Sequence, residues 1–403
     1  MRQKERGGAI ATPALRIIYA SILLGMLSTA AMPVFVGGYV DVLHFSVAEA
    51  GRVASAESLG AAAGGILTAL VLARPGVNLR NAIMVCFAAL AAAHVASGLT
   101  SDLWTFGATR VVAGLAAGTL NAIGAVYISS LEKPDRAFAV SFGLLSVIGP
   151  LGLWCAPPLM ATIGLSNVYF GYAAALVAGL PLMWFYPRAG EARGEVKAHE
   201  AAASPAQSLG VGLILLAILV NFICNGGVWI YAEQIGASAG LGAVLLGRLL
   251  AVAMALGVLG AVVVSVVEDR FGRMKPLVLA HAALGASILW LLTQPGASGY
   301  FLSILILNMS VIVLTPYFMA TLSRASANGG RAAVLGNVTT MIGYGAGPGV
   351  LSFFVRGGDF HAAFVVAAAG VGVSLALTLA GGWLLNNARA QNLDRTAVAD
   401  ARG

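Results

Sequence analysis

The sequence predicts an all-α integral membrane protein in which twelve transmembrane helices form two pseudo-symmetric six-helix halves. The chain of 403 residues is 59% hydrophobic and only 10% charged, whereas a soluble domain carries about 25% charged residues. Twelve apolar runs are each near or above the ~20 residues that an α-helix needs to cross a bilayer. Short motifs also recur at an offset of 196 residues, which indicates two related halves.

The apolar runs give the expected helices and the domain boundaries. The most polar long connector, 188–207, falls in the middle of the chain. It predicts a cytoplasmic linker between an N-terminal half, 1–187, and a C-terminal half, 208–386, with a cytoplasmic tail over 387–403. The twelve runs lie at approximately 14–40, 48–72, 80–98, 102–130, 137–162, 167–187, 208–234, 241–267, 276–294, 299–322, 332–355 and 361–385.

The orientation in the membrane follows from the lysines and arginines, which collect in cytoplasmic connectors. The opposite side receives little beyond Arg356. Both termini are therefore expected in the cytoplasm, and the net charge of +7 reflects topology, not nucleic-acid binding. The basic residues on the cytoplasmic side are Arg2, Lys4, Arg6, Arg16, Arg74, Arg80, Lys133, Arg136, Arg188, Arg193, Lys197, Arg270, Arg273, Lys275, Arg324, Arg331, Arg389, Arg395 and Arg402.

The internal repeat also includes individual residues inside the apolar runs. Gly51-Arg52 is related by the offset of 196 to Gly247-Arg248. Run five contains Gly149-Pro150, and run eleven, the fifth of its half, contains Gly347-Pro348. Two repeated six-helix halves are typical of secondary transporters.

With these features, the chain resembles the major facilitator superfamily over essentially its whole length. The turn Asp269-Arg270-Phe271-Gly272-Arg273-Met274-Lys275 is similar to the family signature between helices eight and nine. Its counterpart between helices two and three is degraded, with Ala73 in the position of the Asp and Val77 in that of an Arg. The resemblance implies that Asp269, Arg270, Gly272 and Arg273 form a conformational latch.

Two further motifs resemble signatures of the same family. Arg110, Gly114 and Gly118 match the helix-four signature, which implies a role of the Arg in proton coupling. Gly143 with Gly149-Pro150-Leu151-Gly152 is similar to the helix-five motif of drug/proton antiporters, although Leu153 replaces its final Gly.

Glu57 and Arg110 are the candidate proton-coupling residues. Counted from the predicted outer ends of their helices, they lie ~13 Å and ~12 Å deep at 1.5 Å per residue, so the two side chains can form an ion pair. Ionisable groups inside a membrane are expensive and usually functional. A proton site and a static structural pair both remain open at this point.

Arg52, Arg248 and Glu233 are expected at the outer mouth. The two arginines lie about one turn inside the surface and can extend to water as interfacial anchors. The alternative is that they form a cationic entrance that favours an anionic substrate. Glu233 is a weaker candidate for a proton site than Glu57.

Polar and aromatic side chains within the runs are candidates for a substrate cavity. In run seven, Asn221, Asn225 and Trp229 are spaced by four and share one helix face. The asparagines can instead bind neighbouring helices, and Trp229 and Tyr231 can belong to an interfacial aromatic belt. The candidate cavity residues are Asn121, Tyr127, Asn221, Asn225, Trp229, Tyr231, Asn308, Tyr317 and Asn337, and the candidate hinges are Gly149, Pro150, Pro316, Gly347 and Pro348.

Nothing in the sequence indicates an enzyme, a metal site or a cofactor. It contains no phosphate-binding Gly-x-x-x-x-Gly-Lys-Ser/Thr loop. Cys86, Cys155 and Cys224 all fall in apolar runs and are expected as small buried hydrophobes. The expected partners are a small-molecule substrate, protons and the lipid bilayer, without nucleic acid, for a monomer in a bacterial inner membrane.

The sequence therefore predicts a proton-coupled secondary transporter of a small organic molecule, with efflux by proton antiport as the first hypothesis. A proton-coupled importer of an organic anion, using Arg110 and Arg52, is the second. A transporter-like sensor or lipid-handling protein without coupled flux is the third.

The asymmetry between the two signature turns makes a prediction about the latch. If the C-terminal copy alone is intact, transport depends on Asp269 and tolerates changes at Ala73. We expect Asp269→Asn to lower the initial rate of transport more than Ala73→Ser does, measured in cells with matched expression. Equal effects of the two substitutions would contradict a latch that depends on the C-terminal copy.

Overall fold

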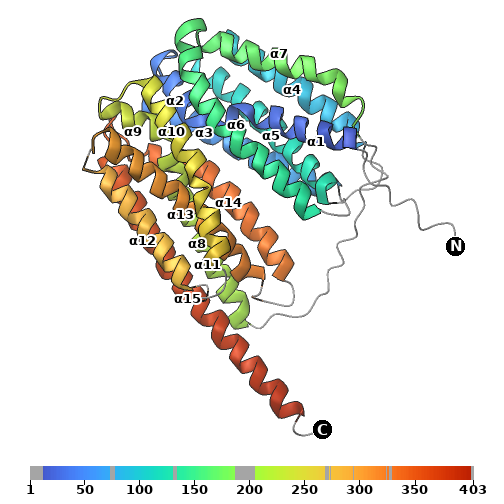
Figure 1. Cartoon of the computed structure of the whole chain (residues 1–403), viewed down its shortest axis with the longest axis vertical. Helices are drawn as coiled ribbons and strands as arrows, with labels where there is room; N and C mark the ends of the chain where they lie inside the picture. The colour runs from blue at the N-terminus through green and yellow to red at the C-terminus, as the bar shows by residue number, and fades with distance from the viewer. Residues whose placement is uncertain are drawn as a thin grey trace, which may run out of the picture. The chain divides into compact units, whose positions relative to one another are not determined.

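The computed structural model describes residues 12–72, 78–129, 134–186, 205–267, 272, 274–293, 295–323, 325 and 329–400, and these are nearly all helical (Figure 1). One isolated β-bridge joins Arg356 and Asp359. The fold is therefore all-α, as the sequence predicts. The helices are α1 (Thr12–Ala30), α2 (Met32–Asp41), α3 (Val47–Leu72), α4 (Leu79–Leu99), α5 (Leu103–Ser129), α6 (Pro134–Ile163), α7 (Leu165–Met183), α8 (Pro205–Ile230), α9 (Ala232–Ser238), α10 (Ala243–Gly257), α11 (Leu259–Val267), α12 (Met274–Leu291), α13 (Ala297–Ser323), α14 (Gly329–Ser352) and α15 (His361–Asp400).

Ten helical segments of the described chain are long and apolar enough to cross a membrane, and α1 with α2 makes an eleventh as one bent span. The predicted run 332–355 corresponds to α14, whose sequence is rich in Gly. It is not among the segments selected by length and apolar composition. The multi-pass architecture is confirmed, whereas the count of twelve spans remains a prediction.

Polar caps determine where the helices of the N-terminal half begin. Before α3, the Ser46 hydroxyl donates to Glu49 Oε2 at 2.7 Å and accepts from the Glu49 backbone N–H at 3.3 Å. Asp102 Oδ2 accepts from the Thr105 backbone N–H at 2.9 Å at the start of α5. Such side chains satisfy the free N–H groups of a first helical turn.

Glycines bring α3 and α5 into backbone contact. A Cβ on Gly60 would lie 2.7 Å from the Val111 carbonyl oxygen, and Cβ atoms on Gly114 and Gly118 would collide with the carbonyl oxygens of Glu57 and Ala61. Small residues allow such close helix packing inside membranes. The contact between Gly114 and Glu57 also places the helix that carries Glu57 directly against the helix that carries Arg110.

The first helix of each half is interrupted at a similar place. α1 and α2 are separated at Ala31 and bent by 45°, while α8 and α9 are separated at Tyr231. Pro33 near the start of α2 accounts for the first break, since proline suits a first helical turn. By contrast, α13 and α14 continue as single helices through the candidate hinges Pro316 and Pro348.

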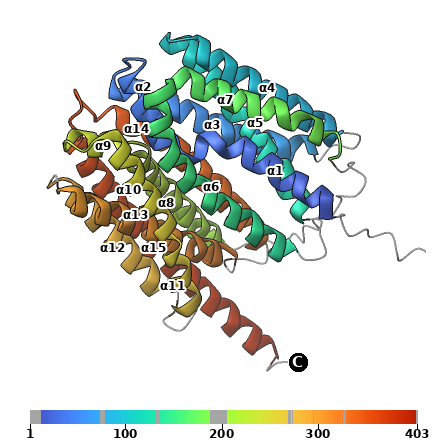
Figure 2. The same ribbon diagram turned by 45° about the horizontal axis from the view of Figure 1, so that its top comes forward.

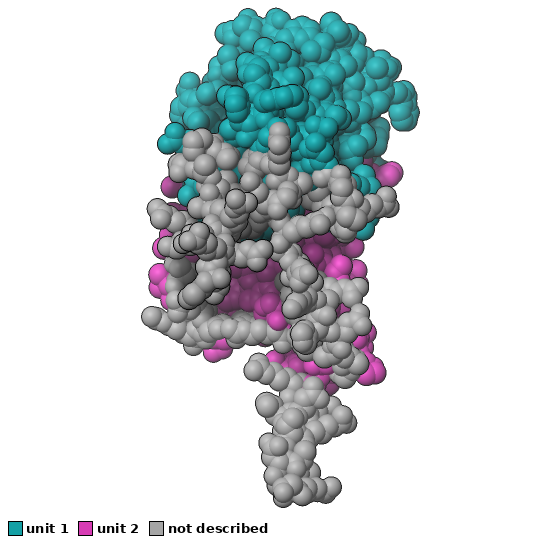
Figure 3. All heavy atoms as spheres, turned by 90° about the vertical axis from the view of Figure 1, so that its right-hand side faces the viewer, with its two compact units in different colours: residues 1–196, 229–255, 355–359 teal, residues 197–228, 256–354, 360–403 magenta. Residues whose placement is uncertain are grey.

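Contacts divide the chain into two compact units, coloured in Figure 3. The first comprises residues 1–196, 229–255 and 355–359, and the second residues 197–228, 256–354 and 360–403. The first unit thus contains α1 to α7, α9 and most of α10. An apolar cluster of this unit includes Phe87, Leu120 and Met183 from three different helices.

Several sequence predictions fall outside the described residues. Asp269, Arg270 and Arg273 of the candidate latch lie there, as does nearly all of the linker 188–207. Gly272 is described and has a φ of +68°, a left-handed conformation that glycine adopts without strain.

The prediction of buried cysteines is correct in part. Cys224 is buried and Cys86 is half-buried. Cys155 is exposed, so the prediction was wrong for this residue. An exposed thiol inside an apolar helix is compatible with a lipid-facing position, because cysteine behaves as a small hydrophobe.

The close contact of α3 and α5 can be tested with single methyl groups. We expect Gly118→Ala to destabilise the protein by roughly 1–3 kcal/mol, because the new Cβ collides with Ala61 backbone that cannot move aside. Gly171→Ala on α7 is the matched control, since a Cβ there meets nothing within 4 Å. Melting temperatures in detergent should fall for the first variant only, and equal melting temperatures would contradict the close packing.

Candidate functional site

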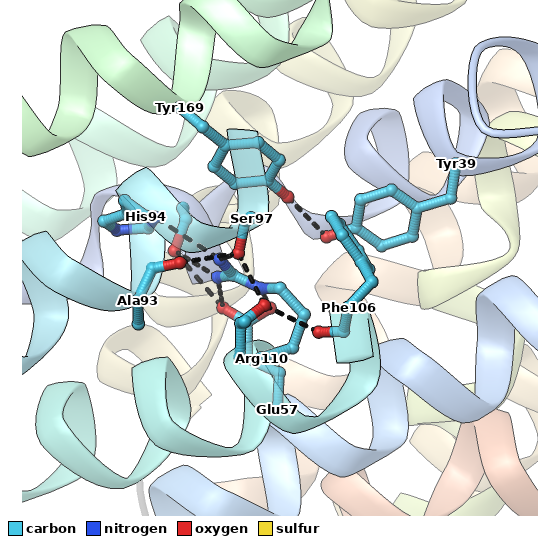
Figure 4. Close-up of polar contacts among 10 residues, drawn as sticks. Tyr39, Glu57, Ala93, His94, Ser97, Phe106, Arg110 and Tyr169 are labelled. Atoms are coloured by element: carbon cyan, nitrogen blue, oxygen red, sulfur yellow. Dashed lines mark hydrogen bonds and ion pairs between the residues drawn. The ribbon is translucent and has the colours of Figure 1, made fainter. Parts of the chain in front are cut away.

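A buried ion pair joins α3 and α5 within the first unit (Figure 4). Arg110 Nε donates to Glu57 Oε2 at 2.9 Å, and Arg110 Nη2 donates to Glu57 Oε1 at 2.7 Å. The side chains are 0% and 1% exposed. This two-point geometry is the strong form of an Arg–carboxylate contact, and it forms the pair that the sequence suggested.

The other N–H groups of Arg110 also have partners. Nη1 donates to Ser97 Oγ at 3.2 Å and faces His94 Nδ1 at 3.3 Å, while Nη2 donates to Ser28 Oγ at 3.4 Å. A guanidinium has five N–H donors and no acceptor, so these contacts account for all five. An additional ligand of Arg110 must therefore displace a group that is already bound.

His94 takes one defined role in this network. Since Arg110 can only donate, His94 Nδ1 is the acceptor, and a neutral ring carries its proton on Nε2. The imidazole stacks on Tyr169 with ring centroids 5.7 Å apart and an interplanar angle of 23°. In the second unit, His281 has a comparable bond between helices, from Nε2 to Ser374 Oγ at 3.0 Å.

Aromatic residues enclose the remaining side of Arg110. Its Cζ lies 5.0 Å from the centroid of the Tyr169 ring, within the range of a cation–π interaction. The hydroxyls of Tyr169 and Tyr39 lie 2.8 Å apart, and Phe106 packs edge-on against both rings (Figure 4). The ion pair is thus enclosed by side chains from α1, α2, α4, α5 and α7.

The chemical consequence follows from the cost of buried charge. Glu57 and Arg110 stabilise each other, whereas removing one partner leaves an uncompensated charge that is strongly unfavourable. Any rearrangement that separates α3 from α5 must therefore supply each charge with another partner.

Asn221 and Asn225 form a separate polar feature in the second unit. They are 0% and 3% exposed, yet both amide atoms of Asn221 and the amide nitrogen of Asn225 have no hydrogen-bond partner. Gly226 and Gly227 of α8 pack on α14, and Cys224 packs against Gly370 of α15. The described contacts pack α8 against α14 and α15, and they leave these amide groups without hydrogen-bond partners.

The other residues of run seven lie in the first unit. Trp229 is 7% exposed, and Tyr231 and Glu233 are 1% and 2% exposed. Trp229 and Tyr231 are thus more deeply buried than residues of an interfacial aromatic belt need to be. Arg52 and Arg248 are exposed, and the Arg248 guanidinium lies 5.3 Å from the centroid of the Trp154 ring.

The remaining cavity candidates are scattered. Tyr127 packs edge-on against Tyr186 in the apolar cluster of the first unit. Asn121 is half-buried and Asn337 is exposed. Asn308 is half-buried and donates to the Ile304 carbonyl at 2.9 Å, and Tyr317 is buried. The structure thus brings Glu57 and Arg110 together in the first unit, and it places Asn221 and Asn225 one helical turn apart on α8 in the second.

Sequence analysis did not identify Ser28, Ser97, Tyr39 or Tyr169 as part of the site. Single serines and tyrosines in apolar helices carry no spacing signal, and only their contacts reveal them. In the part of the chain that the structure describes, no group of three or more metal-ligating side chains is present.

Comparison with known families decides the assignment. The family model of the Major Facilitator Superfamily matches residues 17–348. This chain belongs to the Major Facilitator Superfamily. Among functionally curated proteins, no sequence match was found.

Solved structures of other superfamily transporters share the fold. A bacterial homologue of the human lysosomal transporter Spinster, crystallised inward-facing and unoccupied, is 14% identical, with a TM-score of 0.66 over 93% of this chain and 96% of that one. The nucleoside transporter NupG is 13% identical, with a TM-score of 0.71 over 93% and 99%. The POT-family transporter PepTSo is 11% identical, with a TM-score of 0.73 over 94% and 98%.

The energetics of the ion pair can be tested with matched single and double variants. We expect Glu57→Leu alone to destabilise the protein by about 3–5 kcal/mol, because Arg110 stays buried without its partner. The double variant Glu57→Leu, Arg110→Met removes both charges and should recover most of that loss. Thermal unfolding of the purified variants measures both, and a double variant no more stable than Glu57→Leu would contradict this account.

Proposed function

We propose that this protein is a proton-coupled secondary active transporter that moves a small organic molecule by alternating access. The Glu57–Arg110 pair carries the proposal, because it is a buried carboxylate that can exchange a proton against a fixed cation. Burial favours the neutral form of a carboxyl group and Arg110 favours the charged form. A change in access to water shifts this balance and can thereby couple proton movement to the conformational cycle.

The saturated donors of Arg110 limit how a substrate engages the pair. A cationic or hydrogen-bond-donating substrate can bind Glu57 only after its proton has left, so the substrate and the proton compete. Such competition is the requirement for antiport. The helix-five motif Gly149-Pro150-Leu151-Gly152 resembles that of drug/proton antiporters and supports efflux as the direction.

The alternative is a proton-coupled importer of an organic anion. An anion can bind Arg110 only after protonation has removed Glu57 as a partner, so the proton and the substrate would bind together. Exposed Arg52 and Arg248 favour this reading through attraction of anions at the predicted outer mouth. A third candidate is a sensor with the same fold that binds a ligand without transport.

The asparagine face of α8 is the proposed substrate wall. Buried amide groups without partners are costly, and a ligand with both donor and acceptor groups would satisfy them. Asn221 and Asn225 together offer such a surface at one helical turn of spacing. The proposed substrate is therefore a small molecule with neutral polar groups that match two amides.

The proposed setting is the inner membrane of a bacterium. The lysine and arginine distribution supports cytoplasmic termini and a cytoplasmic linker. A monomer is sufficient for this mechanism, since the two halves supply both sides of the alternating-access cycle.

The test starts with a thermal-shift screen for substrate and continues in proteoliposomes. An imposed pH gradient should drive uptake of the identified compound by the wild-type protein. Glu57→Gln should abolish gradient-driven movement but leave exchange of substrate for substrate, because its side chain no longer binds a proton. Glu49→Gln on the same helix is the control, since that carboxylate is partly exposed and bonded to Ser46.

The possible results separate the candidate functions. Uptake that ignores the gradient would refute proton coupling, and normal coupling in Glu57→Gln would refute the chosen site. The direction of flux under a known gradient distinguishes antiport from symport. Ligand binding without any flux would favour the sensor.

A further inference from the structure

A second buried carboxylate lies at the contact between α2 and α9. Both helices are short, and each follows the break in the first helix of its half, at Ala31 and Tyr231. Both belong to the first unit and pack against each other (Figure 2). Glu233 is the second residue of α9 and lies beyond the end of the candidate span Pro205–Ile230.

Two glycines make room for the start of α9. The Glu233 carboxylate lies directly on Gly37 of α2, where an added Cβ would collide with Oε2. In the same way, the Tyr231 hydroxyl occupies the space over Gly51 of α3. The segment therefore fits into the first unit through side chains that only glycine partners can accept.

The charges around Glu233 do not compensate its own. Its Oε2 accepts a hydrogen bond from Gln234 Nε2 at 2.9 Å, which is a neutral donor. The carboxylate of Asp41 on α2 is the charged group that acts on it, and Tyr39 on α2 is bonded to Tyr169. Arg52 on α3 acts on Tyr231 instead. Among the described residues, no ion pair stabilises Glu233.

Burial without a cation favours the neutral form of the side chain. Burial raises the pKa of Glu233 to about 7 against the opposing hydrogen bond from Gln234, and the charge of Asp41 adds to the rise. Glu57 differs in this respect, since it is paired with Arg110. The two carboxylates are therefore independent sites with different surroundings.

We propose that Glu233 is a second proton-binding site, and that the proton on Glu233 holds α9 docked on α2. A neutral carboxyl fits against Gly37, whereas a carboxylate there is desolvated beside Asp41 and favours separation of the two helices. This proposal concerns the packing of α9 and does not require the transport function proposed above.

The direction of the pH dependence follows from linkage. The pKa of Glu233 is higher in the docked state than in an undocked, solvated state, so the docked state binds the proton more tightly. Docking is strongest below the ordinary pKa of a glutamate, about 4.3. It weakens as the pH rises toward the docked pKa of about 7 and changes no further above it.

Thiol labelling measures the docking directly. The probe is a membrane-impermeant methanethiosulfonate reagent applied to purified protein in which Cys86, Cys155 and Cys224 are replaced by Ser. One new cysteine is placed at Ala232, which is 0% exposed, and in a separate variant at exposed Ala237 of the same helix. The ratio of the two labelling rates cancels the effect of pH on thiol reactivity.

We expect this ratio to be at least tenfold higher at about pH 8 than at about pH 5, on either side of the Glu233 titration. Glu233→Gln should keep the ratio low at both values, because its neutral side chain mimics the protonated form. Gly37→Ala should keep the labelling ratio high at both pH values, because the added Cβ blocks docking of α9 on α2. Glu57→Gln should leave the pH dependence unchanged.

A labelling ratio that is independent of pH, or one that depends on pH equally in Glu233→Gln, would overturn the proposal. Loss of the pH dependence in Glu57→Gln with its retention in Glu233→Gln would assign the effect to Glu57 instead. Size-exclusion profiles confirm that each variant is folded before it is labelled. Because no substrate is added, failure of the transport hypothesis does not affect this result.

Discussion

The structure of the first unit depends on one electrostatic constraint, the burial of Arg110 among apolar helices. A guanidinium cannot lose its charge, so every donor must find a partner inside the bundle. Glu57 satisfies two of them, and Ser28, His94 and Ser97 satisfy the rest. The glycine contacts between α3 and α5 are the steric counterpart of this requirement, because they place the backbone of Glu57 directly against the helix that carries Arg110. Charge and packing at this site are therefore inseparable.

The two buried carboxylates illustrate opposite solutions to the same problem. Glu57 is bonded to a cation and a serine, whereas Glu233 lies on a glycine with only an amide donor as its hydrogen-bond partner. The first arrangement makes the site sensitive to whatever competes for Arg110. The second makes helix packing sensitive to the proton itself. The two carboxylates therefore have different surroundings within the same unit.

Membership of the Major Facilitator Superfamily explains the fold but not the substrate. The solved relatives are 11–14% identical and include transporters of different kinds, so their substrates do not transfer to this chain. The proposed function therefore rests on two sites, namely the Glu57–Arg110 ion pair in the first unit and the amide groups without partners on α8 in the second. Both sites are polar groups in an apolar setting, where each group needs a partner. The proposed function therefore places proton binding and ligand binding at these sites.

The sequence by itself determined the class of protein, its multi-pass helical architecture and the two residues of the ion pair. Apolar length, the distribution of lysine and arginine, and the scarcity of charge are local properties that any window of the chain reveals. Tertiary structure alone decided the partners of Arg110, since isolated serines and tyrosines have no periodic signal, and Tyr169 lies 59 positions from Arg110 in the chain. It also decided the burial of Glu233, which the sequence placed at the outer mouth. The break at Tyr231 contains no proline or glycine, and the carboxylate of Glu233 lies on Gly37, which is 196 positions earlier in the chain.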